Sequence, residues 1–198
     1  MKIITAADKG FESHFLKMLE SVKKLNYDID VYDLGDLNYG EKYLASVSSK
    51  SYKKNPNKPQ YILKKLKEIK PNELLVWMDA DTVLVDRIDE LEKDFDFDIG
   101  VTVRREKKKD VQAGRINSGI IFFRNNKNTL LFFEEWNQKT QELEGDQWAL
   151  NVIYEEKSKP FVIKEFPCEI YNNYYFDETS KKAKILHYKT DKRRRYIR

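Results

Sequence analysis

The sequence contains little cysteine, glycine or proline, and each shortage excludes a class of protein. Its one cysteine, Cys168, cannot form an intramolecular disulfide, and no Cys-x-x-Cys pair or Cys/His cluster is present to hold zinc. Seven glycines and five prolines among 198 residues, with no repeat period, exclude collagen-like, linker-like and solenoid proteins. No apolar run is long enough to span a membrane, and the N terminus lacks a signal peptide. We therefore expect a soluble, cytoplasmic protein with no transmembrane segment.

Apolar side chains are plentiful in spite of these shortages. Hydrophobic residues make up 40% of the chain and aromatic residues 13%, which is enough apolar surface to fill a sizeable core. A length of 198 residues falls within the usual range for one domain. The composition therefore predicts a single globular domain over residues 1–198.

The net charge of +4 is unevenly distributed along the chain. Residues 181–198 contain nine Lys and Arg residues and one acid, Asp191, so this tail carries +8 and residues 1–180 carry −4. Such a tail can attract phosphates, nucleic acid or an anionic membrane, and it can equally be a solvated terminus. Because the rest of the chain is net acidic, we do not expect a continuous basic face that binds nucleic acid.

Strand-like and helix-like patterns alternate along the sequence. Residues 73–78 form a continuous apolar run of strand length, which is typical of a central strand covered on both faces. Other strands are predicted at residues 2–6, 28–34, 97–103, 116–123, 161–166 and 183–188. Helices are predicted at residues 13–25, 59–69, 88–92, 130–143 and 148–154. The alternation predicts an α/β fold with an open, mostly parallel sheet flanked by helices, which binds ligands at the carboxyl ends of its strands.

Two aspartates, Asp79 and Asp81, follow the most hydrophobic predicted strand directly. Alternate side chains of an extended segment lie on the same side, so we expect the two carboxylates to point to one place. Carboxylates close to an apolar core are costly unless they are neutralised, and a divalent ion such as Mg²⁺ or Mn²⁺ would neutralise them. The alternative is an acidic turn that caps the next segment.

Four segments resemble, in the same order, the motifs of GT-A fold glycosyltransferases that use nucleotide sugars. LVWMDADTVLV (residues 75–85) resembles their Asp-x-Asp segment, and INSGIIFFRNN (residues 116–126) resembles their Asn-Ser-Gly strand. EGDQWALN (residues 144–151) is similar to the Gly-Asp-Gln motif of the glycogenin-type retaining members. ILHYKTDKR (residues 185–193) is similar to their C-terminal metal-binding histidine segment. The resemblance implies a Rossmann-like GT-A fold with an open mixed sheet. It also implies a hexosyltransferase with a UDP-sugar donor and a glycan or glycoprotein acceptor.

The same resemblance implies a metal site. Asp79 and Asp81 would bind Mn²⁺ or Mg²⁺, and His187 would complete the protein ligands. The ion would bridge both phosphates and stabilise charge on the departing nucleoside diphosphate. For His187 alone, the simpler interpretation is a surface histidine near a terminus.

The family also places a basic residue shortly after that histidine to hold the diphosphate. The candidates here are Lys189, Lys192 and Arg193, with Lys192 or Arg193 favoured. The sequence has Thr190 where the family often has glycine, and it lacks the usual Pro-Trp ending, so the choice among these cations stays open. This role would also explain the basic tail, as an electrostatic lid over the phosphates.

The resemblance further implies contacts to the two ends of the donor. Thr5, Ala6 and Asp8, at the end of the first predicted strand, match the region that holds the base and ribose. Lys58 could supply a further contact. A plain strand-to-helix turn is the alternative for Asp8.

At the sugar end, Asn117, Ser118, Asp146 and Gln147 would face the transferred hexose, and the anomeric configuration would be retained. An amide is a poor nucleophile, so Gln147 is assigned a charge-stabilising and positioning role. The alternative for Asp146 is a helix N-cap, which is compatible with a role in the site.

Two other functions fit parts of the sequence. Residues 79–84 also fit the nucleophile motif of haloacid-dehalogenase-type phosphatases, with Asp79 as nucleophile and Asp81 as general acid/base. That motif normally opens the chain and needs a later acidic pair, for which only residues 145–147 are comparable. The hypothesis of a nucleic-acid-binding protein depends on the basic tail and on the Tyr and Phe content, and the net acidic charge of residues 1–180 argues against it.

Overall fold

The computed structural model describes residues 1–33, 58–94, 96–105, 114–156, 159–175 and 177–188. Its strands are β1 (Lys2–Ala7), β2 (Asp28–Asp33), β3 (Leu74–Met78), β4 (Thr82–Leu84), β5 (Ile99–Val103), β6 (Ile116–Arg124), β7 (Ile163–Pro167) and β8 (Ile185–His187). Its α-helices are α1 (Glu12–Lys24), α2 (Lys58–Leu66), α3 (Lys127–Leu143), α4 (Asp146–Glu155) and α5 (Cys168–Tyr171). The 3₁₀ helices are η1 (Lys9–Phe11), η3 (Asp89–Lys93) and η4 (Glu178–Lys182).

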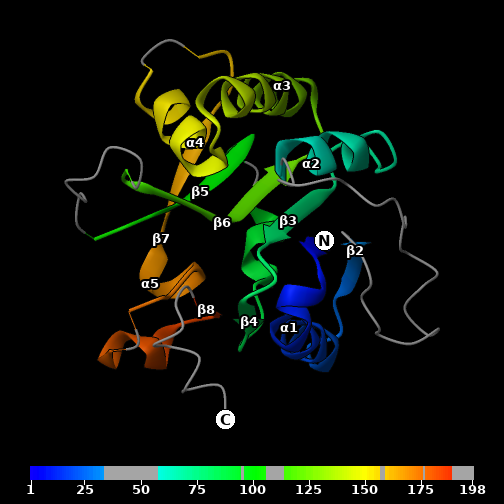
Figure 1. Cartoon of the computed structure of the whole chain (residues 1–198), viewed down its shortest axis with the longest axis vertical. Helices are drawn as coiled ribbons and strands as arrows, with labels where there is room; N and C mark the ends of the chain where they lie inside the picture. The colour runs from blue at the N-terminus through cyan, green and yellow to red at the C-terminus, as the bar shows by residue number, and fades with distance from the viewer. Residues whose placement is uncertain (34–57, 95, 106–113, 157–158, 176, 189–198) are drawn as a thin grey trace.

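Six strands form the main sheet in the order β2-β1-β3-β6-β5-β7 (Figure 1). The β1–β2, β1–β3 and β5–β7 pairs are parallel, and β6 runs antiparallel to both of its neighbours. The mixed, mostly parallel sheet predicted from the sequence is therefore confirmed. The reversal of β6 matters for the site, because it brings the start of β6 beside the carboxyl end of β3.

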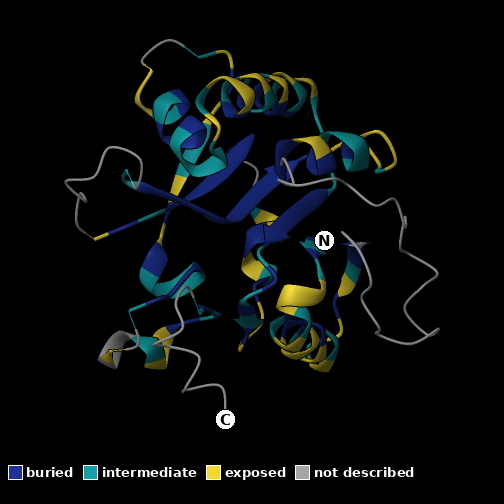
Figure 2. Ribbon diagram, viewed as in Figure 1, coloured by how far each residue is buried: buried dark blue, intermediate teal, exposed yellow. Residues whose placement is uncertain are grey.

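Helices cover both faces of this sheet. Helices α2, α3 and α4 lie together over one face, and α1, β4, β8 and α5 lie over the other (Figure 1). Aromatic residues of α3, such as Phe132 and Trp136, fill the first layer, and Phe15 and Met18 of α1 fill the second. The two central strands, β3 and β6, are buried along their whole length (Figure 2), as the continuous apolar run at residues 73–78 predicted.

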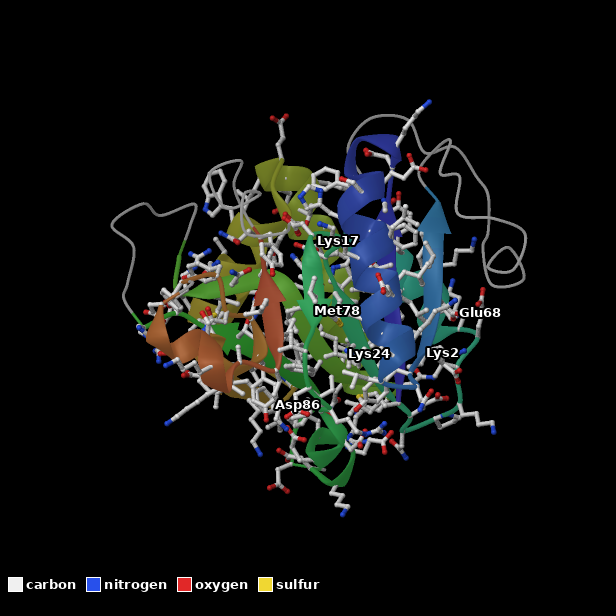
Figure 3. The ribbon with its side chains drawn as sticks, turned by 90° about the horizontal axis from the view of Figure 1, so that it is seen from below. Lys2, Lys17, Lys24, Glu68, Met78 and Asp86 are labelled. Carbon is white, nitrogen blue, oxygen red and sulfur yellow. The ribbon has the colours of Figure 1, made fainter. Side chains whose placement is uncertain are left out.

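A small second sheet joins the end of the chain to the segment after β3. Strand β4 pairs antiparallel with β8, and Thr82 lies opposite His187. The short β4–β8 ladder thus brings a residue from the C-terminal part of the chain to the carboxyl end of a central strand. Seen from below, Met78 at the end of this strand, β3, lies beside α1, which carries Lys17 and Lys24 (Figure 3).

The predicted elements agree with the structure in type and order, and they differ at their ends. Helix α4 begins at Asp146 rather than at residue 148, and α3 begins at Lys127 because the Asn126 side chain accepts a hydrogen bond from Thr129 N–H as its N-cap. The helix predicted at residues 88–92 is the 3₁₀ helix η3. Apolar spacing missed these ends because polar first-turn residues carry no periodic signal.

Candidate functional site

A tight turn carries the two aspartates of the predicted metal site. Thr82 N–H donates to the Asp79 carbonyl over 3.1 Å, and the Thr82 hydroxyl donates to the same oxygen over 2.7 Å. Asp79 N–H in turn donates to the Gly119 carbonyl of β6 over 2.9 Å. The two carboxylates lie close together as expected, but residues 79–82 form a turn rather than the extended segment from which this was inferred. The alternative interpretation, an acidic turn, also fits this geometry, and such a turn is compatible with a metal site.

His187 meets these aspartates across the β4–β8 ladder. Its Nε2 lies 3.1 Å from Asp81 Oδ1, and Tyr188 N–H donates to the Asp81 carbonyl over 2.9 Å. One ligand atom from each of Asp79, Asp81 and His187 lies within 4.8 Å of the others. The imidazole is almost fully buried, so the interpretation of His187 as a surface histidine was wrong.

The three side chains fit a divalent cation. Carboxylate oxygens and an imidazole nitrogen suit Mn²⁺, and the oxygens also suit Mg²⁺. Ligand atoms bound to one ion at about 2.0–2.6 Å can stand up to about 4–5 Å apart, which matches the spacing of this cluster. Because both aspartates keep partial solvent access, an ion could enter from the cleft described below.

A bulge at the start of β6 provides the space for this cluster. Val101 of β5 pairs with Ile121, whereas the next residue, Thr102, pairs with Asn117. Residues 118–120 are therefore extra on β6, and bulges of this kind re-aim backbone groups beside functional sites. A Cβ atom on Gly119 would lie 2.2 Å from His187 Cε1 and 3.1 Å from Asp79 Oδ2. Only glycine leaves room for both side chains. The Asn-Ser-Gly pattern contains this glycine, but its role was not predicted from the sequence.

Lys58, at the start of α2, joins three parts of the site. Its ammonium lies 2.8 Å from Asp79 Oδ1 and 3.0 Å from Asp146 Oδ2, and it donates to the Ser118 carbonyl over 2.8 Å. Burial alone would lower the pKa of Lys58, but the carboxylates of Asp146 and Asp79 raise it above its ordinary value. Lys58 therefore stays charged. Its three N–H groups face acceptors of the protein, so in this arrangement it acts on a ligand through its charge.

Asp146 forms an ion pair with the same lysine. Burial alone would raise the pKa of its carboxyl, but the ion pair with Lys58 lowers it below the usual value. The Ser118 hydroxyl also lies 3.3 Å from Asp146 Oδ2. The N-cap of α4 is Gly145, so Asp146 is the first residue of the helix instead, and its carboxylate still accepts a hydrogen bond from the backbone of Gln147. The indole N–H of Trp136 donates to the Asp146 carbonyl over 2.7 Å and ties the start of α4 to α3.

Asn117 and Gln147 are the other two candidates predicted to face the sugar. Asn117 is fully buried, and its Oδ1 accepts from Gly119 N–H over 2.9 Å, which stabilises the bulge. Gln147 follows Asp146 in the first turn of α4 and lines a hollow of about 210 Å³ with Trp148 and residues 143–145. Asp146 lines the same hollow, which shares no lining residue with the cleft beside Asp79 and Asp81.

A cleft of about 230 Å³ opens beside the aspartates. Ala6, Asp8 and Lys58, three of the residues predicted to contact the donor, line it. The full lining consists of Ala6, Ala7, Asp8, Phe11, Lys58, Tyr61, Trp77, Asp79, Ala80 and Asp81. The Thr5 side chain is fully buried and is not part of this lining, so only its backbone remains a candidate contact.

Aromatic side chains in the cleft were missed by the sequence analysis. Phe11 is an exposed large hydrophobic residue at the cleft wall, and Trp77 donates its indole N–H to Asp79 Oδ1 over 2.8 Å. Asp8 accepts from Gly10 N–H and caps η1, so the strand-to-helix turn forms and Asp8 lines the cleft as well. The signal for Phe11 was an aromatic residue in the short segment between the first strand and the first long helix.

The cations predicted to hold the diphosphate, Lys189, Lys192 and Arg193, lie outside the described residues. In the part of the chain that the structure describes, no helix is long and apolar enough to cross a membrane.

Comparison with known proteins identifies relatives of the chain. The family model for nucleotide-diphospho-sugar transferases matches residues 47–195. A search of curated proteins gave no match. A glycosyltransferase involved in the glycosylation of the major capsid of PBCV-1 has a TM-score of 0.71 at 14% identity, with 99% of this chain and 98% of that chain covered.

Two further solved structures have the same fold. The galactosyltransferase LgtC, in complex with donor and acceptor sugar analogues, has a TM-score of 0.60 at 12% identity, covering 96% of this chain and 88% of that one. The glycosyltransferase GlyE of Streptococcus pneumoniae TIGR4 has a TM-score of 0.64 at 14% identity. This chain covers 54% of GlyE and is itself covered over 96% of its length. At these identities the likeness concerns the fold.

Proposed function

The chain belongs to the nucleotide-diphospho-sugar transferase family and is a glycosyltransferase of the GT-A fold, and we propose that it transfers a hexose from UDP to a hydroxyl acceptor. The acceptor is a glycan or a glycoprotein, and residues 1–198 act as one catalytic domain. The reaction depends on Mn²⁺ or Mg²⁺ held by Asp79, Asp81 and His187. The anomeric configuration of the sugar is retained.

The observation that carries this proposal is the convergence of Asp79, Asp81 and His187 at the edge of one cleft. Their ligand atoms lie within 4.8 Å of one another, although the histidine is far from the aspartates in the sequence. The cleft is the size of a partial nucleotide site, and Asp8 and Phe11 lie on its wall with the aspartates. We assign Asp8 and Ala6 to the base and ribose, and Phe11 to stacking on the base. A bound divalent ion would stabilise negative charge on the leaving diphosphate.

Lys58 and Asp146 prepare the site for this donor. The Lys58 ammonium neutralises part of the charge of Asp79 and Asp146, which lowers the cost of keeping the two carboxylates close together. Its positive charge at the cleft wall also favours a diphosphate. We assign Asp146 and Ser118 to the sugar, supported by their contacts at the cleft wall: Lys58 pairs with Asp146 and donates to the Ser118 carbonyl, and the Ser118 hydroxyl lies 3.3 Å from Asp146 Oδ2.

Retention places the acceptor hydroxyl on the same face as the leaving group. The bond between the anomeric carbon and the phosphate oxygen breaks, a bond to the acceptor oxygen forms, and the acceptor proton passes to the departing phosphate. Gln147, beside Asp146 at the start of α4, stabilises positive charge that builds on the sugar ring. Lys189, Lys192 and Arg193 remain the candidates for the cation that holds the diphosphate.

The phosphatase alternative is not favoured. The family match covers the Asp-x-Asp segment and everything from it to residue 195. The only later acidic segment that could act as a phosphatase metal pair contains Asp146, and this carboxylate pairs with Lys58.

A panel of nucleotide sugars incubated with the protein and Mn²⁺ tests the proposal, because slow hydrolysis of the donor needs no known acceptor. We expect hydrolysis of a UDP-hexose that stops when the metal is chelated. Asp81→Ala should reduce it by at least about 1,000-fold, whereas Asp86→Ala, an exposed aspartate outside the cleft, should leave it unchanged. Metal-independent hydrolysis, or full activity in Asp81→Ala, would refute the metal site. NMR of the released sugar would establish the anomeric course.

A further inference from the structure

A chain of buried hydrogen bonds leads away from His187, on the side opposite Asp81. His187 Nδ1 lies 2.7 Å from Asn172 Oδ1, and Asn172 Nδ2 lies 2.7 Å from the Thr102 hydroxyl. That hydroxyl donates to the Asn117 carbonyl over 3.1 Å. Asn172, Thr102 and Asn117 are fully buried, and His187 is 1% exposed. Water cannot replace these bonds, so each donor has to meet an acceptor within the chain.

We call this chain of hydrogen bonds, from His187 through Asn172 and Thr102 to Asn117, the relay. Its last bond, to the Asn117 carbonyl, determines which group donates and which accepts in the others. The Asn117 carbonyl can only accept, so the single hydroxyl proton of Thr102 points at it. Thr102 can therefore only accept from Asn172, which means that the amide NH₂ of Asn172 faces Thr102 and its oxygen faces His187. An amide oxygen accepts, so His187 Nδ1 carries a proton.

We propose that Asn172 is a positioning residue which, together with Thr102, holds the His187 imidazole with its proton on Nδ1. The Nε2 lone pair is then directed at the position between His187 and Asp81 where the cation binds. This inference rests on the proposed metal site, because Nε2 serves as a ligand only if a cation binds there. A partner on the second ring nitrogen is the general means by which proteins orient a ligating histidine.

Without the Asn172 oxygen, the opposite tautomer would be preferred. Nε2 lies 3.1 Å from Asp81 Oδ1, so a proton on Nε2 would make a good hydrogen bond to this carboxylate. That proton would occupy the lone pair that the cation needs. The relay therefore prevents Nε2 from donating a hydrogen bond to Asp81, which would leave this nitrogen without a lone pair for the cation.

The neighbouring residue provides a matched control. Asn173 is also fully buried, but its Nδ2 donates to the Glu169 carbonyl and its Oδ1 accepts from Tyr175 N–H. Its backbone carbonyl accepts the hydrogen bond from His187 N–H. A substitution at Asn173 thus disturbs the same segment without removing the partner of the imidazole.

The test reads the tautomer from ¹⁵N chemical shifts of labelled histidine in metal-free protein, at a pH where the imidazole is neutral. The chain has two histidines, and His14→Gln assigns the remaining signal to His187. We expect the Nδ1–H form in the wild type, in Asn173→Ala and in Asn172→Asp, which keeps an acceptor. Asn172→Leu should change to the Nε2–H form and bind Mn²⁺ about 10–100-fold more weakly.

The wild-type tautomer in Asn172→Leu, or an equal change in Asn173→Ala, would overturn the proposal. Should Asn172→Leu fail to fold, Thr102→Val replaces it, because loss of the hydroxyl removes what orients the amide and should populate the Nε2–H form. An unchanged tautomer in Thr102→Val would then overturn the proposal. A wild type that shows the Nδ1–H form but binds no Mn²⁺ would refute the metal site alone.

Discussion

Two groups of polar side chains flank the turn at residues 79–82, and different interactions hold them. On one side, the charged Lys58 lies between Asp79 and Asp146. On the other side, His187 is held by Asn172 in a relay of neutral groups. The first group depends on opposite charges, and the second on the direction of each hydrogen bond.

The difference shows how one site can contain several carboxylates and still accept a cation. Asp79 Oδ1 accepts from Lys58 and from the Trp77 indole, whereas Oδ2 points toward Gly119 and His187. A lysine ammonium carries charge but no lone pair, so it neutralises carboxylates without competing as a ligand. The neutral relay adds no charge and fixes which nitrogen faces the ion. One group therefore sets the charge of the site, and the other sets its geometry.

Removing the charge should have the largest effect. Lys58→Met leaves the Asp79 and Asp146 carboxylates without their cation, so we expect the free energy of unfolding to fall by about 2–3 kcal/mol and donor turnover to fall at least about 100-fold. Lys65→Met is the matched control, because Lys65 lies on the same helix and also pairs with two acids, Asp30 and Glu68. The two lysine side chains are similarly exposed, at 11% and 13%.

Urea unfolding and donor hydrolysis, measured on both variants, separate structure from function. Lys65→Met should lose stability but keep its turnover, because Lys65 is not part of the cleft lining. If Lys58→Met and Lys65→Met lose the same amount of both, the charge of Lys58 has no particular role in the site.

Crowding the imidazole should have the next largest effect. The Cβ atom of Gly119→Ala would overlap the His187 ring and press on Asp79 Oδ2, so the ring has to move away from the aspartates. We expect Mn²⁺ affinity to fall by about tenfold or more, measured by calorimetry. In Gly145→Ala the nearest atoms to the new Cβ are 3.9 Å away, so affinity should stay at the wild-type value. Equal affinities in the two variants would show that His187 is not held against Gly119.

The sequence predicted most of the frame of this molecule. The apolar run before Asp79 indicated a central strand, and the four ordered motifs indicated the family and the three residues that the fold brings together. These features are local in the sequence or resemble known motifs. They needed no knowledge of how distant side chains meet.

The residues that support the site were less accessible to sequence reasoning. Lys58 was predicted only as a further contact to the donor, because nothing near it in the sequence shows that Asp79 and Asp146 will face it. Asn172 was not predicted as a site residue, because its contact with His187 depends on the short pairing of the next residue, Asn173, with β8. The β6 bulge that admits His187 beside Gly119 likewise depends on pairing between strands, which side-chain pattern alone does not fix.

The smallest expected effect concerns the acid side of the stability profile. The pKa of Asp146 is lower in the folded protein than its usual value of 3.8, so its pairing with Lys58 stabilises the fold fully above that pH. This contribution is lost as the pH falls through the folded-state pKa. Because one third of the Asp146 side chain is exposed, solvent limits the contribution to about 1 kcal/mol at most.

Comparison of the wild type with Asp146→Asn isolates this contribution, since all other carboxylates titrate in both proteins. Urea unfolding should show the wild type as more stable at pH 5–7. The difference should shrink steadily below about pH 4, where the paired carboxylate takes up its proton. A difference that stays constant down to pH 2 would mean that Asp146 contributes through packing, and that charge on the Lys58 side of the site is balanced by Asp79 alone.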